Sequence, residues 1–266
     1  MLGPTERVHP RARHLEQRTT LEVLERLHAE DFVAVRALDA VLPKLAKLAE
    51  AIACALRAGG RLVYVGAGTS GRLAALDAAE CPPTFGTKPS QILAVMAGGK
   101  RALTRAAEGA EDDSGAGARA MQKLRVSSRD VVVGISASGT TPFVLGALAE
   151  ARRRKATQAL LTGNPKARTT PRIVLDTGAE LIAGSTRLKA GTATKLALNA
   201  LTTAAMVKLG HTRDGRMINL RATNLKLSAR AVRLVVELGG VTPAKARVLL
   251  ERSHQNVRAA VERALR

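Results

Sequence analysis

Two short segments rich in glycine and hydroxyl side chains each follow an apolar run. The first reads GAGTSGR over residues 66–72, and the second reads SASGTTP over residues 136–142. Glycine permits a tight turn and a close approach to a ligand, and the first turn of a helix presents N–H groups that attract anions. Both segments predict strand-to-helix turns that could bind an anion, through Gly68, Thr69, Ser70, Ser136, Ser138, Gly139, Thr140 and Thr141.

The first segment also matches the G-x-G-x-x-G pattern of dinucleotide-binding folds, through Gly66, Gly68 and Gly71. Such a fold places an acidic residue at the end of the next strand, where it binds the ribose. The next apolar run, residues 92–96, continues instead into the string AGGK, which holds no carboxylate. The sequence therefore argues against a dinucleotide oxidoreductase, although a rise in melting temperature with NAD would restore that alternative.

An alternation of short apolar runs with segments of helical length would position these turns. Strands are expected over residues 61–65, 92–96, 131–135, 159–162 and 172–176. Strands that alternate with helices favour a parallel sheet covered on both faces. We therefore predict an α/β fold, a three-layer sandwich with a five-stranded parallel sheet.

Helical periodicity precedes and follows these strands along the chain. Apolar residues recur at helical spacing over residues 20–58, and the helical pattern returns after Ser185. Three short helices are expected near the end of the chain, and the middle one is capped by Thr242 and opened by Pro243. The predicted organisation is an N-terminal helical section over residues 1–58, the α/β domain over 59–215 and a small C-terminal helical bundle over 216–266.

Composition limits the partners and the compartment. Forty-two Lys and Arg against twenty-two Asp and Glu give a net charge of +20, which attracts anions in general. Aromatic residues are only 2%, so stacking platforms for single-stranded nucleic acid are absent, and no specific nucleic-acid partner is expected. The first thirty residues hold no continuous apolar run, which predicts a cytoplasmic protein without a membrane anchor. Two cysteines and five scattered histidines offer no metal-ligand spacing.

Five longer strings narrow the interpretation: GAGTSGRLAAL over residues 66–76, DAAECPPTFG over 77–86, AAEGAED over 106–112, GSTRLKAGTATK over 184–195 and RATNLK over 221–226. In this order and spacing they resemble the N-acetylmuramic acid 6-phosphate etherases. The likeness runs from Thr5-Glu6 to about Val257. The two hydroxyl-rich turns resemble those of the sugar-isomerase domain, which implies that their side chains and backbone amides hold a substrate phosphate.

The resemblance implies a carbon–oxygen lyase of cell-wall amino sugar recycling. A proton would leave carbon 2 of the open-chain sugar, D-lactate would leave carbon 3 and water would add, giving N-acetylglucosamine 6-phosphate. The family's acid, in ECPPTF, corresponds to Glu80, and its second catalytic glutamate, in GAED, corresponds to Glu111. No metal or organic cofactor is implied. The family also implies a homodimer with its site where two subunits meet.

The residues around these glutamates carry further expectations. Pro82-Pro83 should end the helix that begins at the first turn, and so fix the carboxyl group of Glu80. Without the resemblance, Glu111 and the acidic residues beside it could be a solvated helix face. Cys81 is expected to be a packing residue. Of Arg187, Lys189 and Lys226, which could neutralise the phosphate or the lactyl carboxylate, Lys226 is the candidate for substrate binding.

The sequence also departs from the family pattern. Thr140 stands where the family usually has arginine, and Val8-His9-Pro10 stands where it has Arg-Asn-Pro. The chain stops before the last helical pair that many members carry. A non-catalytic phosphosugar sensor, as in the related glucokinase regulatory protein, therefore stays open as an alternative. Retention of Glu80 and Glu111 favours the enzyme.

Overall fold

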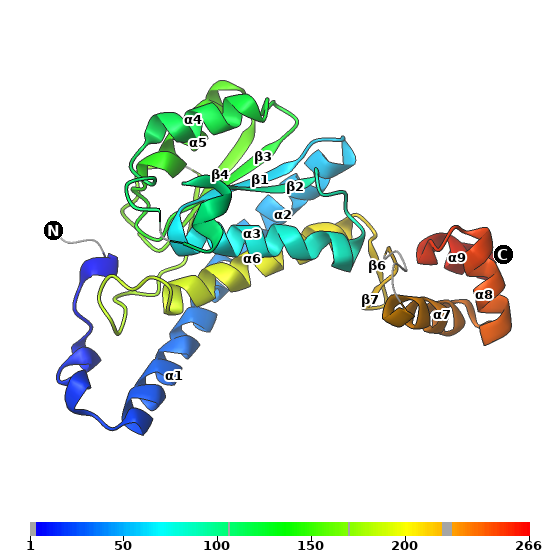
Figure 1. Ribbon diagram of the computed structural model, residues 1–266, viewed down its shortest axis with the longest axis horizontal. Coiled ribbons are helices and arrows are strands. Elements are labelled where there is room, and N and C mark those ends of the chain that lie inside the picture. Colours follow the sequence, from blue (N-terminus) through cyan, green and yellow to red (C-terminus); the bar gives the residue numbers. More distant parts are fainter. Residues whose placement is uncertain (1–3, 106, 170, 220–224) are drawn as a thin grey trace. The chain divides into compact units, whose positions relative to one another are not determined.

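The computed structural model describes residues 4–105, 107–169, 171–219 and 225–266 (Figure 1). The chain divides into two compact units, one formed by Met1–Ala78 with Ser90–Ala205 and the other by Ala79–Pro89 with Met206–Arg266. No helix in the described part is long and apolar enough to span a membrane. The predicted domain boundaries after residues 58 and 215 stay a prediction.

A five-stranded parallel sheet forms the core of the first unit. Its strands are β1 (Leu62–Gly66), β2 (Ile92–Met96), β3 (Val131–Ile135), β4 (Thr157–Thr162) and β5 (Arg172–Val174). They lie in the order β2-β1-β3-β4-β5, and every neighbouring pair is parallel. All residues of β1 and β3 are buried, because central strands of a parallel sheet are covered on both faces. The predicted five-stranded α/β fold is confirmed.

Helices cover both faces of this sheet (Figure 1). Val63 and Val65 of β1 pack in one cluster with buried residues of α5 (Pro142–Arg153), which lies beside α4 (Ser114–Lys123). On the opposite face the hydroxyl of Tyr64 donates to the carboxylate of Asp77, 3.0 Å away in α3 (Gly68–Phe85). Thr202 of α6 (Lys189–Lys208) donates to the same carboxylate at 3.1 Å. These contacts give the three layers that the sequence predicts.

The N-terminal section holds short 3₁₀ turns and two helices. The first turn is η1 (Pro4–Glu6), and two more follow over Pro10–Ala12 and Leu15–Gln17. Helix α1 (Thr20–Arg36) begins with a capping box, in which the Thr19 hydroxyl accepts from the Glu22 amide and the Glu22 carboxylate accepts from the Thr19 amide. A short 3₁₀ turn, Asp39–Val41, leads into α2 (Leu42–Arg57).

Helix α3 runs further than the sequence predicts. The prediction that Pro82-Pro83 ends it is wrong, since both prolines lie inside the helix, which continues to Phe85. The last turn is closed by the amide of Gly86, which donates to the Pro82 carbonyl at 2.9 Å. The side chains of Cys81 and Phe85 are buried, so packing compensates for the two donors that proline removes.

The second unit is a small helical bundle. Helices α7 (Leu225–Gly239), α8 (Pro243–Arg252) and α9 (Val257–Ala264) pack around a buried apolar cluster. The hydroxyl of Thr242 caps α8 by accepting from the Lys245 amide at 3.3 Å, and Pro243 opens the helix, as predicted. A two-stranded hairpin, β6 (Thr212–Arg213) with β7 (Arg216–Met217), precedes the bundle.

Candidate functional site

Strands β1 and β3 end side by side at one edge of the sheet. Gly66, the last residue of β1, pairs with Ile135, the last residue of β3. The chain passes from β1 to β2 on one side and then returns to β3 on the other, so the connections that leave β1 and β3 diverge. Open α/β sheets form their ligand crevices at such points. Both predicted anion-binding turns lie here.

The first turn joins β1 to α3 within two residues. A Cβ atom at Gly71 would lie 2.8 Å from Cγ of Met96, so only glycine lets the start of α3 approach β2 this closely. Thr69 and Ser70 lie in the first helical turn, where backbone amides have no helical acceptor. In the described part of the chain, no hydrogen bond to either hydroxyl is found. These hydroxyls therefore remain available to a ligand.

The second turn contains a network of hydroxyl groups. Oγ of Ser136 lies 2.7 Å from Oγ1 of Thr141 and 3.3 Å from Oγ of Ser138, and it accepts from the amide of Gly139 at 3.0 Å. Oγ of Ser138 accepts in turn from the amide and the hydroxyl of Thr140. Thr141 occupies the N-cap position of α5, but its hydroxyl contacts Ser136 and caps no amide.

The end of β4 supports this second turn from behind. Nδ2 of Asn164 donates to the Ser138 carbonyl at 2.8 Å, and the hydroxyl of Thr162 donates to the Ala137 carbonyl at 3.3 Å. Gly139 has φ of +71°, and a Cβ atom there would lie 2.7 Å from Cβ of Ala167. The position therefore requires glycine both for its conformation and for its space.

A cavity of about 310 Å³ lies between the two turns. It brings together the predicted residues Gly68, Thr69, Ser70, Glu111, Ser136, Ser138, Thr140 and Thr141. Gly139, also predicted, is buried behind this lining. Outside the two turns and their strands, the cavity is also lined by residues that were not predicted as ligands, namely Thr5, Glu6, Asp112, Gly184 and Thr186. The strings AAEGAED and GSTRLKAGTATK, and the pair Thr5-Glu6 where the family likeness begins, contain all of these residues and could have indicated them.

Glu111 reaches the cavity from a loop. The alternative that it belongs to a helix face is wrong, because α4 begins only at Ser114, after its N-cap Asp113. The carbonyl of Glu111 accepts from the amide of Phe143 at 2.9 Å, which attaches this loop to the start of α5. The backbone of Glu111 is therefore fixed beside the second turn, while its side chain is exposed.

Carboxylates, and no cationic side chains, line the described part of this cavity. The three are Glu6, Glu111 and Asp112. Lys189 is buried and forms an ion pair with Glu30, so it does not serve a ligand in the cavity. Burial alone would raise the pKa of Glu30, but the hydrogen bond and charge of Lys189 hold it below its ordinary value. The side chain of the predicted Lys226 lies outside the described residues.

The predicted acid, Glu80, lies in the second compact unit. It stands near the C-terminal end of α3 and its side chain is exposed. The adjacent Cys81 is buried, as expected for a packing residue. The role of Glu80 stays a prediction.

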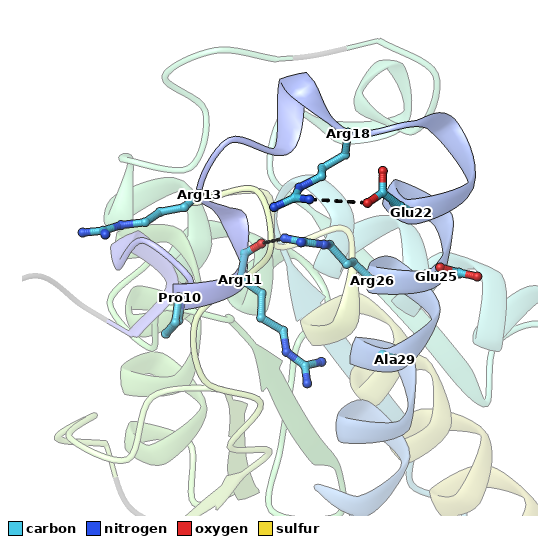
Figure 2. A pocket seen from close by; sticks show the side chains of 8 residues that line it. All are labelled: Pro10, Arg11, Arg13, Arg18, Glu22, Glu25, Arg26 and Ala29. Atoms are coloured by element: carbon cyan, nitrogen blue, oxygen red, sulfur yellow. Dashed lines mark hydrogen bonds and ion pairs between the residues drawn. The ribbon is translucent and has the colours of Figure 1, made fainter.

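A second cavity, of about 540 Å³, lies beside α1 and is lined by Pro10, Arg11, Arg13, Arg18, Glu22, Glu25, Arg26 and Ala29 (Figure 2). Two of its guanidinium groups already contact other protein groups. Arg18 pairs with Glu22, Arg26 donates to the Arg11 carbonyl, and Arg13 points away from the other labelled side chains (Figure 2). This arginine-lined cavity contains none of the predicted site residues.

Two curated relatives identify the family. The N-acetylmuramic acid 6-phosphate etherase of Gloeothece citriformis (strain PCC 7424) is 47% identical over 97% of this chain and 85% of its own length. N-acetylmuramic acid 6-phosphate etherase 2 of Vibrio cholerae serotype O1 is 45% identical over 95% of this chain and 84% of its own length. The chain belongs to the N-acetylmuramic acid 6-phosphate etherase family.

Further comparisons agree with the fold of this family. Residues 44–152 match the N-terminal SIS domain of glucokinase regulatory protein, a range that holds both turns and Glu111. A phosphoheptose isomerase from Francisella tularensis superposes with a TM-score of 0.52 at 18% identity, covering 71% of this chain and 98% of that protein. The etherase-family chain therefore has a sugar-isomerase fold, as the sequence resemblance implies.

Proposed function

We propose that this chain cleaves the D-lactyl ether of N-acetylmuramic acid 6-phosphate, releasing D-lactate and N-acetylglucosamine 6-phosphate in amino sugar recycling. The observation that carries the proposal is the cavity between the two turns, in which hydroxyl groups of both turns and the side chain of Glu111 lie together in a member of the etherase family. No metal or cofactor takes part in the proposed reaction.

The phosphate of the substrate binds between the two turns. Thr69 and Ser70 contribute hydroxyl donors and the amides that open α3, an 18-residue helix whose positive dipole end faces an anion at this position. Ser138 contributes a hydroxyl donor from the other side, and Thr140 contributes one when its hydroxyl turns from Ser138 toward the phosphate. Hydroxyl groups and backbone amides can bind a phosphate without a lysine or arginine when several of them donate hydrogen bonds to it.

The elimination requires one proton acceptor and one proton donor. Glu111 takes the proton from carbon 2, which is acidic because it stands next to the carbonyl of the open-chain sugar. Glu80 protonates the ether oxygen as its bond to carbon 3 breaks, so D-lactate leaves. Water then adds across the double bond, its oxygen to carbon 3 and a proton to carbon 2. The roles of both glutamates come from the family motifs ECPPTF and GAED.

The active form is a homodimer in this proposal. Helix α1 supports it, because Leu21, Leu24, Phe32 and Val35 follow helical spacing on one stripe and are each at least half exposed. A second copy of the chain covers this stripe. Sedimentation equilibrium should give a dimer for the wild type and a monomer for Leu24→Glu with Phe32→Glu. A monomeric wild type would contradict this part of the proposal.

The location proposed is the cytoplasm. Cys54 is an exposed thiol outside any disulfide bond, as is usual in reducing compartments. Fractionation of the source cells tests this, and recovery of the protein outside the cytoplasm would contradict it.

Release of D-lactate from N-acetylmuramic acid 6-phosphate by the purified chain tests the reaction directly. We expect release by the wild type, and a loss of about a hundredfold or more in kcat for Glu80→Gln and for Glu111→Gln. Glu108→Gln is the matched control, since Glu108 is an exposed neighbour of Glu111 outside the cavity lining. Binding of the sugar phosphate without release would instead support the non-catalytic sensor.

A further inference from the structure

One carboxylate in the cavity has no role in the proposed reaction. Glu6 belongs to η1, at the start of the chain, and its side chain lines the same cavity as the two hydroxyl-rich turns. More than one hundred residues separate it in sequence from Glu111. Its presence there therefore depends on how the N-terminal segment is held.

The segment is held by its neighbour, Thr5. Thr5 is 5% exposed, and its carbonyl accepts a hydrogen bond from the amide of Gly184 at 2.8 Å. This contact attaches η1 to the loop that precedes α6. A Cβ atom at Gly184 would lie 3.4 Å from Oε2 of Glu6, so the carboxylate packs directly against this loop. Glu6 is consequently placed by the fold, although its side chain is exposed to the cavity.

The charge of Glu6 limits what it can bind. None of the ion pairs found among the described residues involves Glu6, and no lysine or arginine belongs to the described lining of the cavity. Its Oε1 accepts only a weak bond, at 3.3 Å, from the hydroxyl of Thr5. An ionised carboxylate only accepts hydrogen bonds, and it repels the phosphate and the lactyl carboxylate of the substrate.

We propose that Glu6 contacts the substrate by accepting a hydrogen bond from an uncharged donor of the sugar, either a hydroxyl group or the N–H of the acetamido group. The inference rests on the proposed function. Repulsion between Glu6 and the phosphate also favours the binding orientation in which the phosphate lies at the hydroxyl-rich turns. Glu6 is then a specificity-determining residue, distinct from the two catalytic glutamates.

Calorimetric titration with two sugar phosphates tests this contact. N-acetylglucosamine 6-phosphate carries the acetamido group, whereas glucose 6-phosphate has a hydroxyl in its place. We expect Glu6→Ala to raise Kd by about tenfold to a hundredfold, which is the range for a charge-assisted hydrogen bond. A loss confined to the acetamido sugar identifies the N–H as the donor, and an equal loss for both sugars identifies a shared hydroxyl group.

Two further variants distinguish a direct hydrogen bond to Glu6 from a general effect of negative charge on binding of the sugar phosphate. Glu6→Asp keeps the charge but withdraws the carboxylate by one methylene group, so we expect most of the loss in affinity to remain. Glu16→Gln removes an exposed carboxylate from the same N-terminal section, outside the cavity lining, and should leave Kd unchanged. Equal melting temperatures for all variants would show that the fold is intact.

The outcomes also separate this inference from the function on which it rests. A wild type that binds the sugar phosphate and releases D-lactate, with Kd unchanged within twofold in Glu6→Ala, would overturn the role of Glu6 alone. A wild type that neither binds the sugar phosphates nor releases D-lactate would overturn both.

Discussion

The two turns that border the cavity are built from the same kinds of residue but differ in their hydrogen bonding. In the second turn, Ser136, Ser138 and Thr141 already contact one another, and Gly139 donates to Ser136. In the first turn, no hydrogen bond to the hydroxyls of Thr69 and Ser70 is found among the described residues. A glycine-and-hydroxyl sequence can therefore form a self-supporting framework or leave its donors for a ligand, and only the three-dimensional contacts distinguish the two.

The largest effect should follow from disturbing the framework turn at Gly139. Gly139→Ala places a side chain at φ of +71° and within 2.8 Å of Oγ1 of Thr162, so both strain and overpacking act. We expect a loss of about 2–4 kcal/mol in the free energy of unfolding, measured by urea denaturation.

Gly59→Ala is the matched control for that change. Gly59 also has positive φ, of +76°, but nothing lies within 4 Å of an added Cβ atom. Strain alone should cost about 1–2 kcal/mol there. Equal losses for the two variants would contradict the account, because close packing behind the second turn would then add nothing to the cost of backbone strain.

A smaller effect separates the two turns most clearly. Ser136→Ala removes the group that joins Thr141, Ser138 and Gly139, and should lower the free energy of unfolding by about 1–3 kcal/mol. Ser70→Ala removes a hydroxyl without a protein partner in the described structure, so stability should change by less than about 0.5 kcal/mol. Its Kd for the sugar phosphate should instead rise by about fivefold to tenfold. If Ser70→Ala destabilised the protein as much as Ser136→Ala does, the proposed difference in hydrogen bonding between the two turns would be contradicted.

A buried carboxylate in α3, Asp77, should make the free energy of unfolding depend on pH. Burial raises the pKa of Asp77 above its ordinary value, and the hydrogen bonds from Tyr64 and Thr202 offset this only in part. The folded state therefore binds a proton at Asp77 more readily than the unfolded state does. Protonated Asp77 therefore contributes to the free energy of unfolding below pH 3.8, the pKa of the group in the unfolded chain. This contribution is lost as the pH rises through the pKa of Asp77 in the folded state.

Asp77→Asn resembles the protonated form and should remove this dependence. The wild type should lose stability relative to the variant as the pH rises from below 3.8 to neutrality. Urea denaturation across that pH range measures the difference. A difference that does not change with pH, or one with the opposite sign, would show that the buried carboxylate does not titrate as described.

The smallest expected effect concerns the charge at the second turn. Thr140 is exposed at the edge of the cavity, at a position where the family resemblance leads us to expect arginine. Thr140→Arg should lower Kd for the sugar phosphate by about threefold to tenfold at low salt, with a smaller gain at high salt. Titration at two salt concentrations measures both. Unchanged affinity would indicate that this position does not face the bound anion.

The sequence predicts the sheet well because its strands are continuous apolar runs bounded by glycine or polar residues. The predicted β2 and β3 match the observed residues 92–96 and 131–135 at both ends. The prediction that Pro82-Pro83 ends α3 is wrong. Proline locally disfavours a helix, but the buried side chains of Cys81 and Phe85 stabilise this one. Local sequence cannot show such tertiary compensation.

The candidate site is predicted in part for the same reason. Ser136 directly follows β3, and Thr69 and Ser70 lie in the first turn of the helix that follows β1, so the parallel sheet brings them to one edge. Glu6 reaches the cavity only through the contact between the Thr5 carbonyl and the Gly184 amide, which joins segments far apart in the chain. Neither the hydrophobic periodicity nor the spacing of the motifs predicts that contact.

The central claim is that hydrogen-bond donors of the two turns bind the phosphate of an amino sugar. Titration of the wild type and of Thr69→Ala with Ser70→Ala, using N-acetylglucosamine with and without its 6-phosphate, tests it most directly. We expect the wild type to bind the phosphorylated sugar at least about a hundredfold more tightly, and the double variant to lose about tenfold or more of that preference. Equal affinity of the wild type for the two sugars, or an unchanged preference in the double variant, would contradict the account.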